Sequence, residues 1–195
     1  MSINLSKGQK ISLEKEAGNK LSKVTMGLGW DVAKKKGGFL GFLGGGGGSV
    51  DLDASCIMFD DNKNQIDTVW FRQLNSKDGS VLHTGDNRTG EGDGDDEQIV
   101  VNLNKLPANV TNLFFVVNSF TGQNFSQIEN AYCRIVDAIS SKEVAKYNLS
   151  CQGSHNAMVM CKLSLQNGDW QMQAIGENGS GATFENLKPL MLKNL

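Results

Sequence analysis

Residues 83–97 read His-Thr-Gly-Asp-Asn-Arg-Thr-Gly-Glu-Gly-Asp-Gly-Asp-Asp-Glu, which places six carboxylates and four glycines in one short stretch. Arg88 alone offsets that negative charge. Unit charges about 4 Å apart repel each other by ~4 kcal/mol at an effective dielectric constant near 20, so we expect a cation among these side chains. The glycines permit positive φ angles, which allow backbone carbonyl oxygens to converge beside the carboxylates. The stretch therefore predicts an ion-binding loop.

The oxygen ligands of this loop favour calcium. Ca²⁺ takes roughly six to eight oxygens in a flexible geometry, whereas Mg²⁺ demands near-octahedral geometry and gives up water reluctantly. Because the three consecutive carboxylates of residues 95–97 cannot all face one point in an extended chain, we expect either two ions or one outward carboxylate, and we favour two ions. The alternative is a solvated acidic loop that binds no ion.

Two other kinds of loop do not fit this stretch. Counting from Asp86, Arg88 and Gly90 occupy the third and fifth positions, where an EF-hand needs oxygen-bearing side chains. A loop that cradles phosphate presents backbone N–H groups and usually a lysine, whereas these carboxylates would repel a nucleotide. The formal net charge of the whole chain is −2, so we expect no nucleic-acid partner.

The rest of the chain reads as short strands. Apolar residues alternate with polar or small ones over 24–28 and 50–58, which is typical of strands with one buried face, and residues 113–117 are apolar throughout, which indicates a fully buried strand. Similar alternation predicts an early strand that includes Ile11 and Leu13 and a further strand over 66–74. Helical periodicity is confined to 184–192, with one short helical turn expected within 122–129. The pattern predicts an all-β fold, a two-sheet β-sandwich of roughly ten strands with little helix and with the acidic loop at one end.

Three aspartates outside the loop are further candidate ligands. Asp31 directly follows a predicted strand and is either a turn-capping residue or a carboxylate aimed at the loop. Asp51 and Asp53 lie on one face of the next strand, where adjacent carboxylates are unfavourable unless they are exposed or share a cation. The full set of predicted metal ligands is Asp31, Asp51, Asp53, Asp86, Asn87, Gly90, Glu91, Asp93, Asp95, Asp96 and Glu97.

Residues 34–49 combine lysines, two Phe-Leu pairs and a run of glycines, which predicts a flexible loop because glycine is entropically costly to order. The loop could touch a membrane surface or a partner, although an insertion between strands is the simpler interpretation. No charged leader with a long apolar stretch opens the chain, and no run approaches ~18 apolar residues, which predicts a cytoplasmic protein. We expect residues 1–195 to form a single domain.

Several segments together resemble one family, the TerD family of tellurium-resistance and stress-response proteins, and within it the TerZ-like members. The matching segments are Gly27-Leu28-Gly29-Trp30-Asp31, Asp51-Leu52-Asp53-Ala54, His83-Thr84-Gly85-Asp86-Asn87, Thr89-Gly90-Glu91-Gly92-Asp93-Gly94-Asp95-Asp96-Glu97, Val117-Asn118-Ser119-Phe120, Gly122-Gln123 and Asn130-Ala131-Tyr132-Cys133-Arg134. The resemblance implies a calcium-binding β-sandwich that acts in a bacterial response to tellurite and other stresses, with no established enzymatic activity. Other tellurium-resistance proteins and the inner membrane surface are the partners it suggests. The insertion at 34–49 is the main departure from shorter family members.

A metal-dependent hydrolase is the alternative function. Clustered carboxylates could hold two metals that activate water, and His83 beside them could act as a base. The chain contains only two histidines, and an ion saturated by protein oxygens would offer no open position for a substrate. His83 is more simply a strand-end residue bonded to the backbone. We therefore expect a calcium-binding protein that is not an enzyme.

Overall fold

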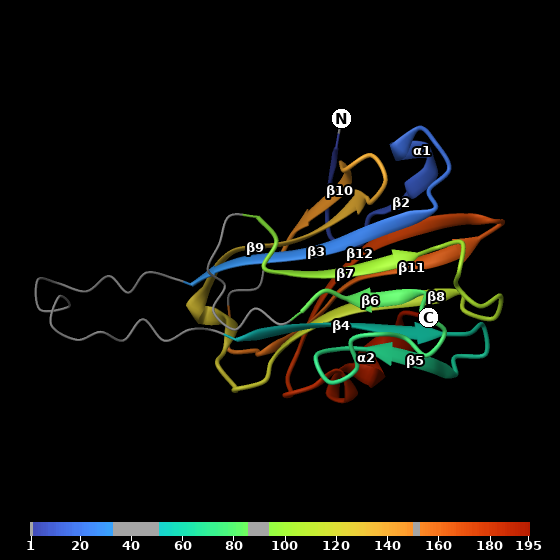
Figure 1. The fold of residues 1–195 in the computed structure, drawn as a ribbon. Helices are drawn as coiled ribbons and strands as arrows, with labels where there is room; N and C mark the ends of the chain where they lie inside the picture. Colours follow the sequence, from blue (N-terminus) through green and yellow to red (C-terminus); the bar gives the residue numbers. More distant parts are fainter. Residues whose placement is uncertain (1, 33–50, 86–93, 150–152) are drawn as a thin grey trace, which may run out of the picture.

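Two β-sheets pack face to face in this protein (Figure 1). The structure is a computed structural model that describes residues 2–32, 51–85, 94–149 and 153–195. In spatial order, the first sheet contains β1 (Ile3–Leu5), β10 (Lys142–Asn148), β9 (Ile128–Asp137), β3 (Lys23–Val32), β7 (Glu97–Asn102) and β6 (Val81–His83). The second contains β2 (Lys10–Ser12), β12 (Asp169–Gly179), β11 (Ala157–Gln166), β8 (Asn112–Ser119), β4 (Leu52–Phe59) and β5 (Gln65–Val69). The predicted all-β sandwich is confirmed, with twelve strands in the described residues where roughly ten were expected.

The core lies between the sheets and follows from alternation along the strands. Ile99 and Val101 of β7 are fully buried, whereas Gln98, Val100 and Asn102, which alternate with them, are partly exposed. Leu113, Phe115 and Val117 of β8 also face this core, and all three are at most 2% exposed. Apolar area removed from water stabilises folding by about 25 cal/mol per Å², so this layer is the main source of stability.

The outer face of the second sheet is covered by the C-terminal segment. The 3₁₀ turn η3 (Phe184–Leu187) leads into α2 (Lys188–Lys193), and both pack over β4 and β8. Ile57 and Phe114 are buried beneath them although they point away from the central core. The predicted helical segment near 184–192 is therefore confirmed, as is the short helical turn, which the structure places at η2 (Phe125–Gln127).

Two sequence expectations were wrong near strand ends. The strand predicted to start around Ile11 and to include Leu13 instead gives way to a short helix, α1 (Leu13–Ala17), because the Ser12 side chain caps its first turn by accepting from Lys15 N–H at 3.1 Å. The strand predicted over 66–74 ends at Val69. A tight turn between Trp70 and Gln73 follows it.

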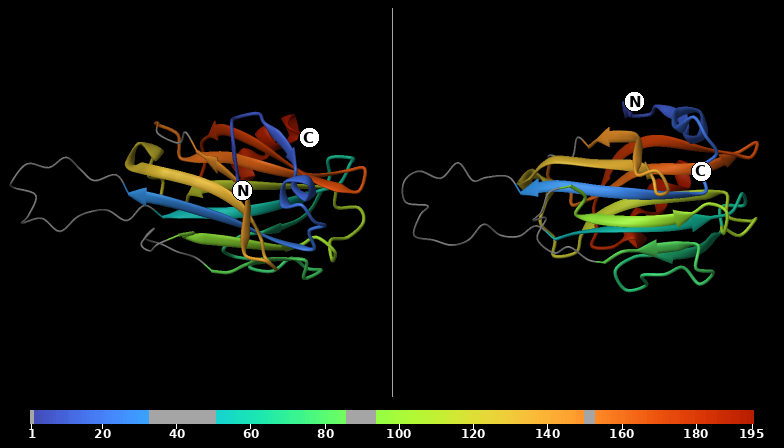
Figure 2. Two further views of the ribbon diagram at one scale, coloured as in Figure 1. Left: turned by 90° about the horizontal axis from the view of Figure 1, so that it is seen from above. Right: turned by 45° about the horizontal axis from the view of Figure 1, so that its top comes forward.

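The last residues of β3 and the first residues of β4 and β7 lie at one end of the sandwich (Figure 1), and both further views keep β3 and β4 together there (Figure 2). We call this the acidic end, defined by Asp31, Asp51, Asp53 and residues 95–97. Within the described parts of the chain, no helix has the length and apolar character needed to cross a membrane. The predicted flexible loop at 34–49 lies outside the described residues, and the single domain over 1–195 stays a prediction.

Candidate metal centre

Three consecutive carboxylates enter β7 and point in three different directions. Asp95 contacts β9 on the outer face of the first sheet, Asp96 binds the backbone of β3, and Glu97 reaches across the core to β4. Neighbouring side chains of an extended chain point to opposite faces, so this divergence is expected. The three residues tie the start of β7 to both sheets.

Asp95 is held by the guanidinium of Arg134. Its Oδ1 accepts from Arg134 Nε at 2.7 Å and its Oδ2 accepts from the terminal nitrogen Nη2 at 3.1 Å, so the pair is bidentate. Tyr132 donates its hydroxyl to the carbonyl oxygen of Gly94 at 2.8 Å, and Gln98 Nε2 donates to Asp95 at 3.3 Å. The Asp95 side chain is only 1% exposed. This carboxylate is therefore engaged by protein groups.

Two glycines of β3 make room for that arrangement. A Cβ atom at Gly27 would lie 2.2 Å from Oδ2 of Asp95, and one at Gly29 would lie 2.5 Å from the ring of Tyr132. Any larger residue at either position would push these side chains off the sheet. The Gly-Leu-Gly pattern in β3 therefore lets Asp95 and Tyr132 lie flat on the strand backbone.

The titration behaviour of this outer-face group follows from its contacts. The hydrogen bond to Asp95 raises the pKa of the Arg134 guanidinium further above its already high value. Burial, together with the nearby negative charge of Asp95, raises the pKa of Tyr132 to about 12. Both groups therefore keep their protons at neutral pH and remain donors to the acidic segment.

Asp96 lies where negative charges crowd together. Its carboxylate Oδ2 accepts from Trp30 N–H at 2.9 Å, and its own N–H donates to Leu28 O at 2.8 Å. Burial raises the pKa of the Asp96 carboxyl, the charges of Asp31 and Asp95 raise it further, and the Trp30 hydrogen bond opposes them. Burial and the neighbouring carboxylates therefore disfavour the ionised form of Asp96 in the folded chain.

Asp31 occupies the exposed edge of the same crowded region. Its Oδ2 accepts from Asn130 Nδ2 at 2.7 Å. Asn130 adopts a positive φ of 53°, at the point where the pairing register between β3 and β9 shifts by one residue. The sequence predicted two alternative roles for Asp31, a turn-capping residue or a carboxylate aimed at the loop. The structure places it close enough to Asp96 for their charges to interact.

Glu97 lies inside the core together with His83, and both side chains are fully buried. Glu97 Oε2 accepts from Ala54 N–H at 2.6 Å and lies 3.5 Å from His83 Nε2. His83 Nδ1 accepts from Gly85 N–H at 3.2 Å, which assigns the ring hydrogen to Nε2, facing Glu97. The backbone bond matches the expectation for a strand-end histidine, and burial keeps His83 away from solvent.

Ala54 explains why a carboxylate is needed at that point. The pairing of β4 with β5 begins at Cys56, so Ala54 lies in the part of β4 that has no β5 residue beside it. Its N–H is therefore not matched by a ladder partner on that side, and a buried unpaired N–H costs about 1–3 kcal/mol. Glu97 supplies the acceptor from the opposite sheet.

Asp51 and Asp53 approach the same end from β4. Asp53 is 6% exposed and lies opposite Asn118 in the ladder between β4 and β8, on the face away from the core as alternation predicted. Asn118 donates its Nδ2 to Gly181 O at 3.0 Å. Asp51 is half-buried just before the strand begins. The two side chains are thus at the acidic end, but on the side of the second sheet.

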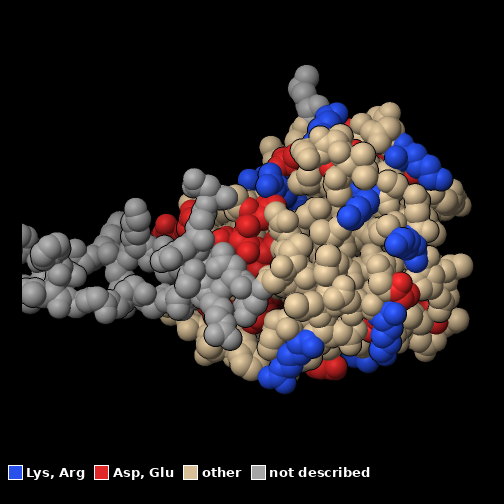
Figure 3. All heavy atoms as spheres, viewed as in Figure 1, with Lys and Arg blue, Asp and Glu red and all other residues tan. Residues whose placement is uncertain are grey.

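The described carboxylates offer the oxygen ligands that a hard cation prefers, but they are too few and too dispersed to complete a ligand shell. Acidic side chains gather at the left of the described part of the molecule in Figure 3, whereas lysines and arginines are spread over the rest of that face. Within the described ranges, no three His, Cys, Asp or Glu side chains converge as a metal-holding group. The remaining predicted ligands, which lie outside the described residues, are Asp86, Asn87, Gly90, Glu91 and Asp93.

Comparisons with known proteins match both the sequence segments and the fold. The family model described as the TerD domain matches residues 1–190. The chain is 52% identical to the tellurium resistance protein TerZ of Serratia marcescens, over 95% of this chain and 94% of that protein. It is 40% identical to the stress response protein SCP2 of Bacillus subtilis (strain 168), over 96% of this chain and 98% of that one.

A solved structure shares the sandwich. The crystal structure of a homologue of the telluride resistance protein TerD from Streptomyces coelicolor A3(2) superposes with a TM-score of 0.65 at 16% identity, over 83% of this chain and 92% of that chain. At this identity the likeness bears on the fold alone. The family match spans nearly the whole chain, and the identity to TerZ extends over most of both proteins. The chain therefore belongs to the TerD family of tellurium-resistance and stress-response proteins.

Proposed function

We propose that this chain is a cytoplasmic, non-enzymatic stress-response protein that binds calcium at the acidic end of its sandwich. The observation that carries the proposal is the position of Asp96, whose ionised form is disfavoured by burial and by the charges of Asp31 and Asp95. A divalent cation beside it would convert this repulsion into coordination. The family membership agrees with a role in tellurium resistance or stress response.

Asp31 and Asp96 are the described residues best suited to hold the ion. Both carboxylates lie at the acidic end, close enough for their charges to interact, and Ca²⁺ takes roughly six to eight such oxygens. Asp95 differs, because its two oxygens already accept from Arg134. Asp95 and Arg134 would therefore orient the segment, and Asp96 would bind.

The number of ions follows from the same division of roles. The sequence argument allowed one outward carboxylate as the alternative to a second ion, and Asp95 takes that outward direction. Under this proposal Asp31 and Asp96 would serve one ion, and the second ion that we favoured would draw on predicted ligands outside the described ranges. The stoichiometry of a titration separates the two cases.

Isothermal titration calorimetry with Ca²⁺ and with Mg²⁺ tests the proposal. We expect saturable Ca²⁺ binding, with Mg²⁺ at least about tenfold weaker because it demands a tighter octahedral shell. An Asp31→Asn, Asp96→Asn double variant should lose most of the Ca²⁺ heat, whereas Asp169→Asn is a matched control on β12 outside the acidic end. Equal affinity for both ions, or the same Ca²⁺ heat in the double variant, would contradict the proposal.

Cellular partners remain predictions. The family suggests other tellurium-resistance proteins, and the Lys and Phe-Leu composition of residues 34–49 suggests the inner membrane surface. Those residues lie outside the described ranges, so neither suggestion gains support from the structure.

A further inference from the structure

The turn that follows β5 is a rigid two-residue hairpin with Phe71 and Arg72 at its tip. Trp70 N–H donates to Gln73 O at 3.0 Å, and Gln73 N–H donates to Trp70 O at 2.9 Å. The carboxylate of Asp67 on β5 accepts from Gln73 Nε2 at 2.9 Å and from the next turn, through the Lys77 N–H, at 2.7 Å. A tip fixed in this way loses little conformational entropy when it binds a partner.

Aromatic rings surround the tip. The ring of Phe71 packs edge to face against Trp70, at a centroid distance of 4.9 Å, and against Phe120, at 5.4 Å. Trp70 in turn packs against Phe184 of η3 at 5.2 Å, which connects the group to the covered face of the second sheet. Phe120 comes from the turn after β8 and is 40% exposed. The rings form a surface platform supported from below.

Arg72 completes the platform with a positive charge. Its guanidinium carbon lies 5.2 Å from the ring centroid of Phe71, 5.5 Å from that of Trp70 and 5.7 Å from that of Phe120. The side chain is exposed, and the described part of the chain offers it no carboxylate at ion-pair distance. Stacking on rings holds a guanidinium while leaving its N–H donors available to a planar anion.

We propose that Trp70, Phe71, Arg72 and Phe120 form a docking surface for an acidic segment of a partner protein, in which a carboxylate lies next to an aromatic or aliphatic side chain. The carboxylate would accept two N–H groups of Arg72, and the apolar neighbour would pack on the ring of Phe120. Trp and Arg are enriched in the few residues that dominate binding energy at protein interfaces.

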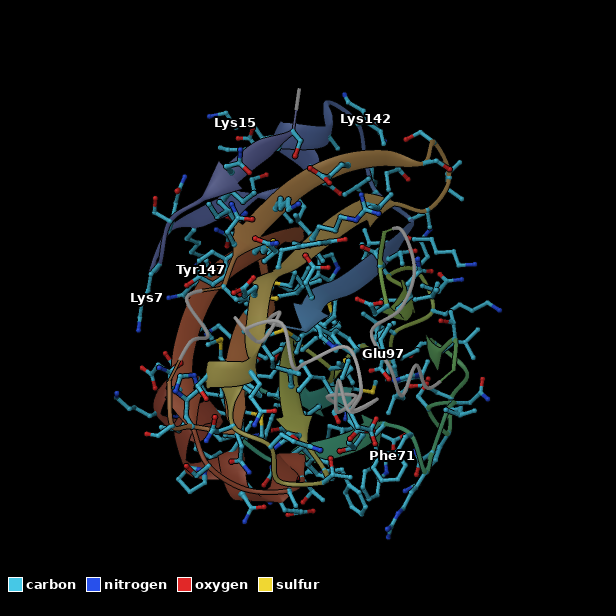
Figure 4. All side chains as sticks on the ribbon, turned by 90° about the vertical axis from the view of Figure 1, so that its left-hand side faces the viewer. Lys7, Lys15, Phe71, Glu97, Lys142 and Tyr147 are labelled. Atoms are coloured by element: carbon cyan, nitrogen blue, oxygen red, sulfur yellow. The ribbon has the colours of Figure 1, made fainter. Side chains whose placement is uncertain are left out.

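The surroundings favour an acidic peptide over a nucleic acid. Viewed from the acidic end, Phe71 lies at the lower edge of the molecule and Glu97 nearer its middle (Figure 4). A nucleic-acid backbone needs several neutralising cations and would be repelled by the carboxylates of the acidic end, whereas a peptide with a single carboxylate needs only the one guanidinium that this platform offers. Leu74, which directly follows the hairpin in the chain, is a further large apolar residue with 40% of its surface exposed.

In the test, a library of displayed random peptides is first depleted of binders to the Arg72→Ala variant and then selected for binding to the full chain. The variant should fold normally, because the guanidinium that it lacks lies at an exposed site. We expect enriched peptides to carry Asp or Glu directly beside an aromatic or aliphatic residue. Measured by fluorescence polarisation, their affinity should fall at least about tenfold in Arg72→Ala and roughly threefold in Arg72→Lys, because the ammonium cannot bind bidentately. The matched control, Lys77→Ala, removes another exposed cation and should change affinity less than about twofold.

Four outcomes of the peptide experiments would overturn the proposal. These are the absence of enrichment, enriched peptides without acidic residues, equal binding to the chain and to Arg72→Ala, and equal losses in Arg72→Ala and Lys77→Ala. Light scattering separates a second copy of this chain from a foreign partner. Dimerisation that depends on Arg72 would also replace the proposed occupant and overturn it. Thermal unfolding of each variant confirms that a loss of binding is not a loss of folding.

Discussion

The strand at the centre of the second sheet and the acidic end of the sandwich are held by different forces. In β8, residues 113–117 are at most 2% exposed and lie between β4 and β11, so burial of apolar area stabilises them. At the acidic end, Asp95, Asp96 and Glu97 are held by a guanidinium and by backbone N–H groups. One fold thus combines a centre stabilised by apolar burial with an end held by charged and polar contacts.

The largest expected effect tests the centre. Replacing Phe115 with Ala removes a fully buried ring between β4 and β11 and should lower the free energy of unfolding by about 3–5 kcal/mol. Urea unfolding monitored by circular dichroism measures this loss. Because Phe115 is remote from charge, the loss should be the same with calcium and with chelator. A variant that calcium restores to normal stability would break the distinction between centre and end.

The next effect tests the ion pair that anchors the acidic segment. Replacing Arg134 with Met keeps an aliphatic side chain but leaves Asp95, 1% exposed, without its guanidinium, which should cost about 1–3 kcal/mol. Replacing Glu143 with Gln is the matched control, because it removes the charge of the other carboxylate that Arg134 binds. The Glu143 side chain is 27% exposed. That change should cost less than about 0.5 kcal/mol. Equal costs would mean that Asp95 does not depend on the pair.

The smallest expected effect on stability comes from replacing Asp96, which should stabilise the protein in chelator and weaken its stabilisation by calcium. Replacing Asp96 with Asn keeps an oxygen that accepts from Trp30 N–H but removes the charge that Asp31 and Asp95 disfavour. In chelator, the midpoint of thermal unfolding should therefore rise by roughly 1–2 °C. With calcium present the variant should instead gain less stability from the ion than the parent chain does. Scanning calorimetry in both conditions measures the change, and a lower midpoint in chelator would contradict the charge-crowding account.

The contribution of the Asp96 carboxyl to the free energy of unfolding should depend on pH with a definite sign. The pKa of Asp96 is raised in the folded chain, so between the unfolded value near ~3.9 and the folded value the folded state binds more protons. The free energy of unfolding contributed by this group is thus highest below that window and falls as pH rises through it. Asp96→Asn should remove this slope in metal-free protein, and urea titrations at several pH values test it. An unchanged slope would assign the pH dependence to other groups.

The sequence predicted more of the fold than of the site, and particular residues show why. Alternating or continuous apolar residues predicted the strands that became β3, β4 and β8, because a sandwich strand must bury one or both faces. The short helix α1 was missed, since five residues give no clear helical period and only the Ser12 cap signalled it. The segment that forms the hairpin at Trp70–Gln73 was predicted to be part of a strand, because aromatic residues favour strands.

For the site, local composition identified the acidic residues but could not show which group each one contacts. Nothing in the sequence near Arg134 or Tyr132 indicates that they bind a segment some forty residues earlier, because that contact depends on the pairing of β9 with β3. The one available signal was the pair Gly27 and Gly29, whose missing side chains admit Asp95 and Tyr132. Consecutive carboxylates look equivalent in sequence, and only the fold assigns them different directions.

Hydrogen exchange with and without calcium tests the central claim most directly. Binding stabilises the folded state by RT ln(1 + [L]/Kd), about 2.7 kcal/mol at ~100-fold excess over Kd, and the gain should appear where the ion is held. We predict that calcium slows exchange at residues 94–98 by about tenfold or more relative to chelator, with a smaller change in magnesium, while residues 113–117 remain the slower-exchanging segment in all three conditions. Identical exchange at residues 94–98 in calcium and in chelator would contradict the account and indicate an acidic end that is merely solvated.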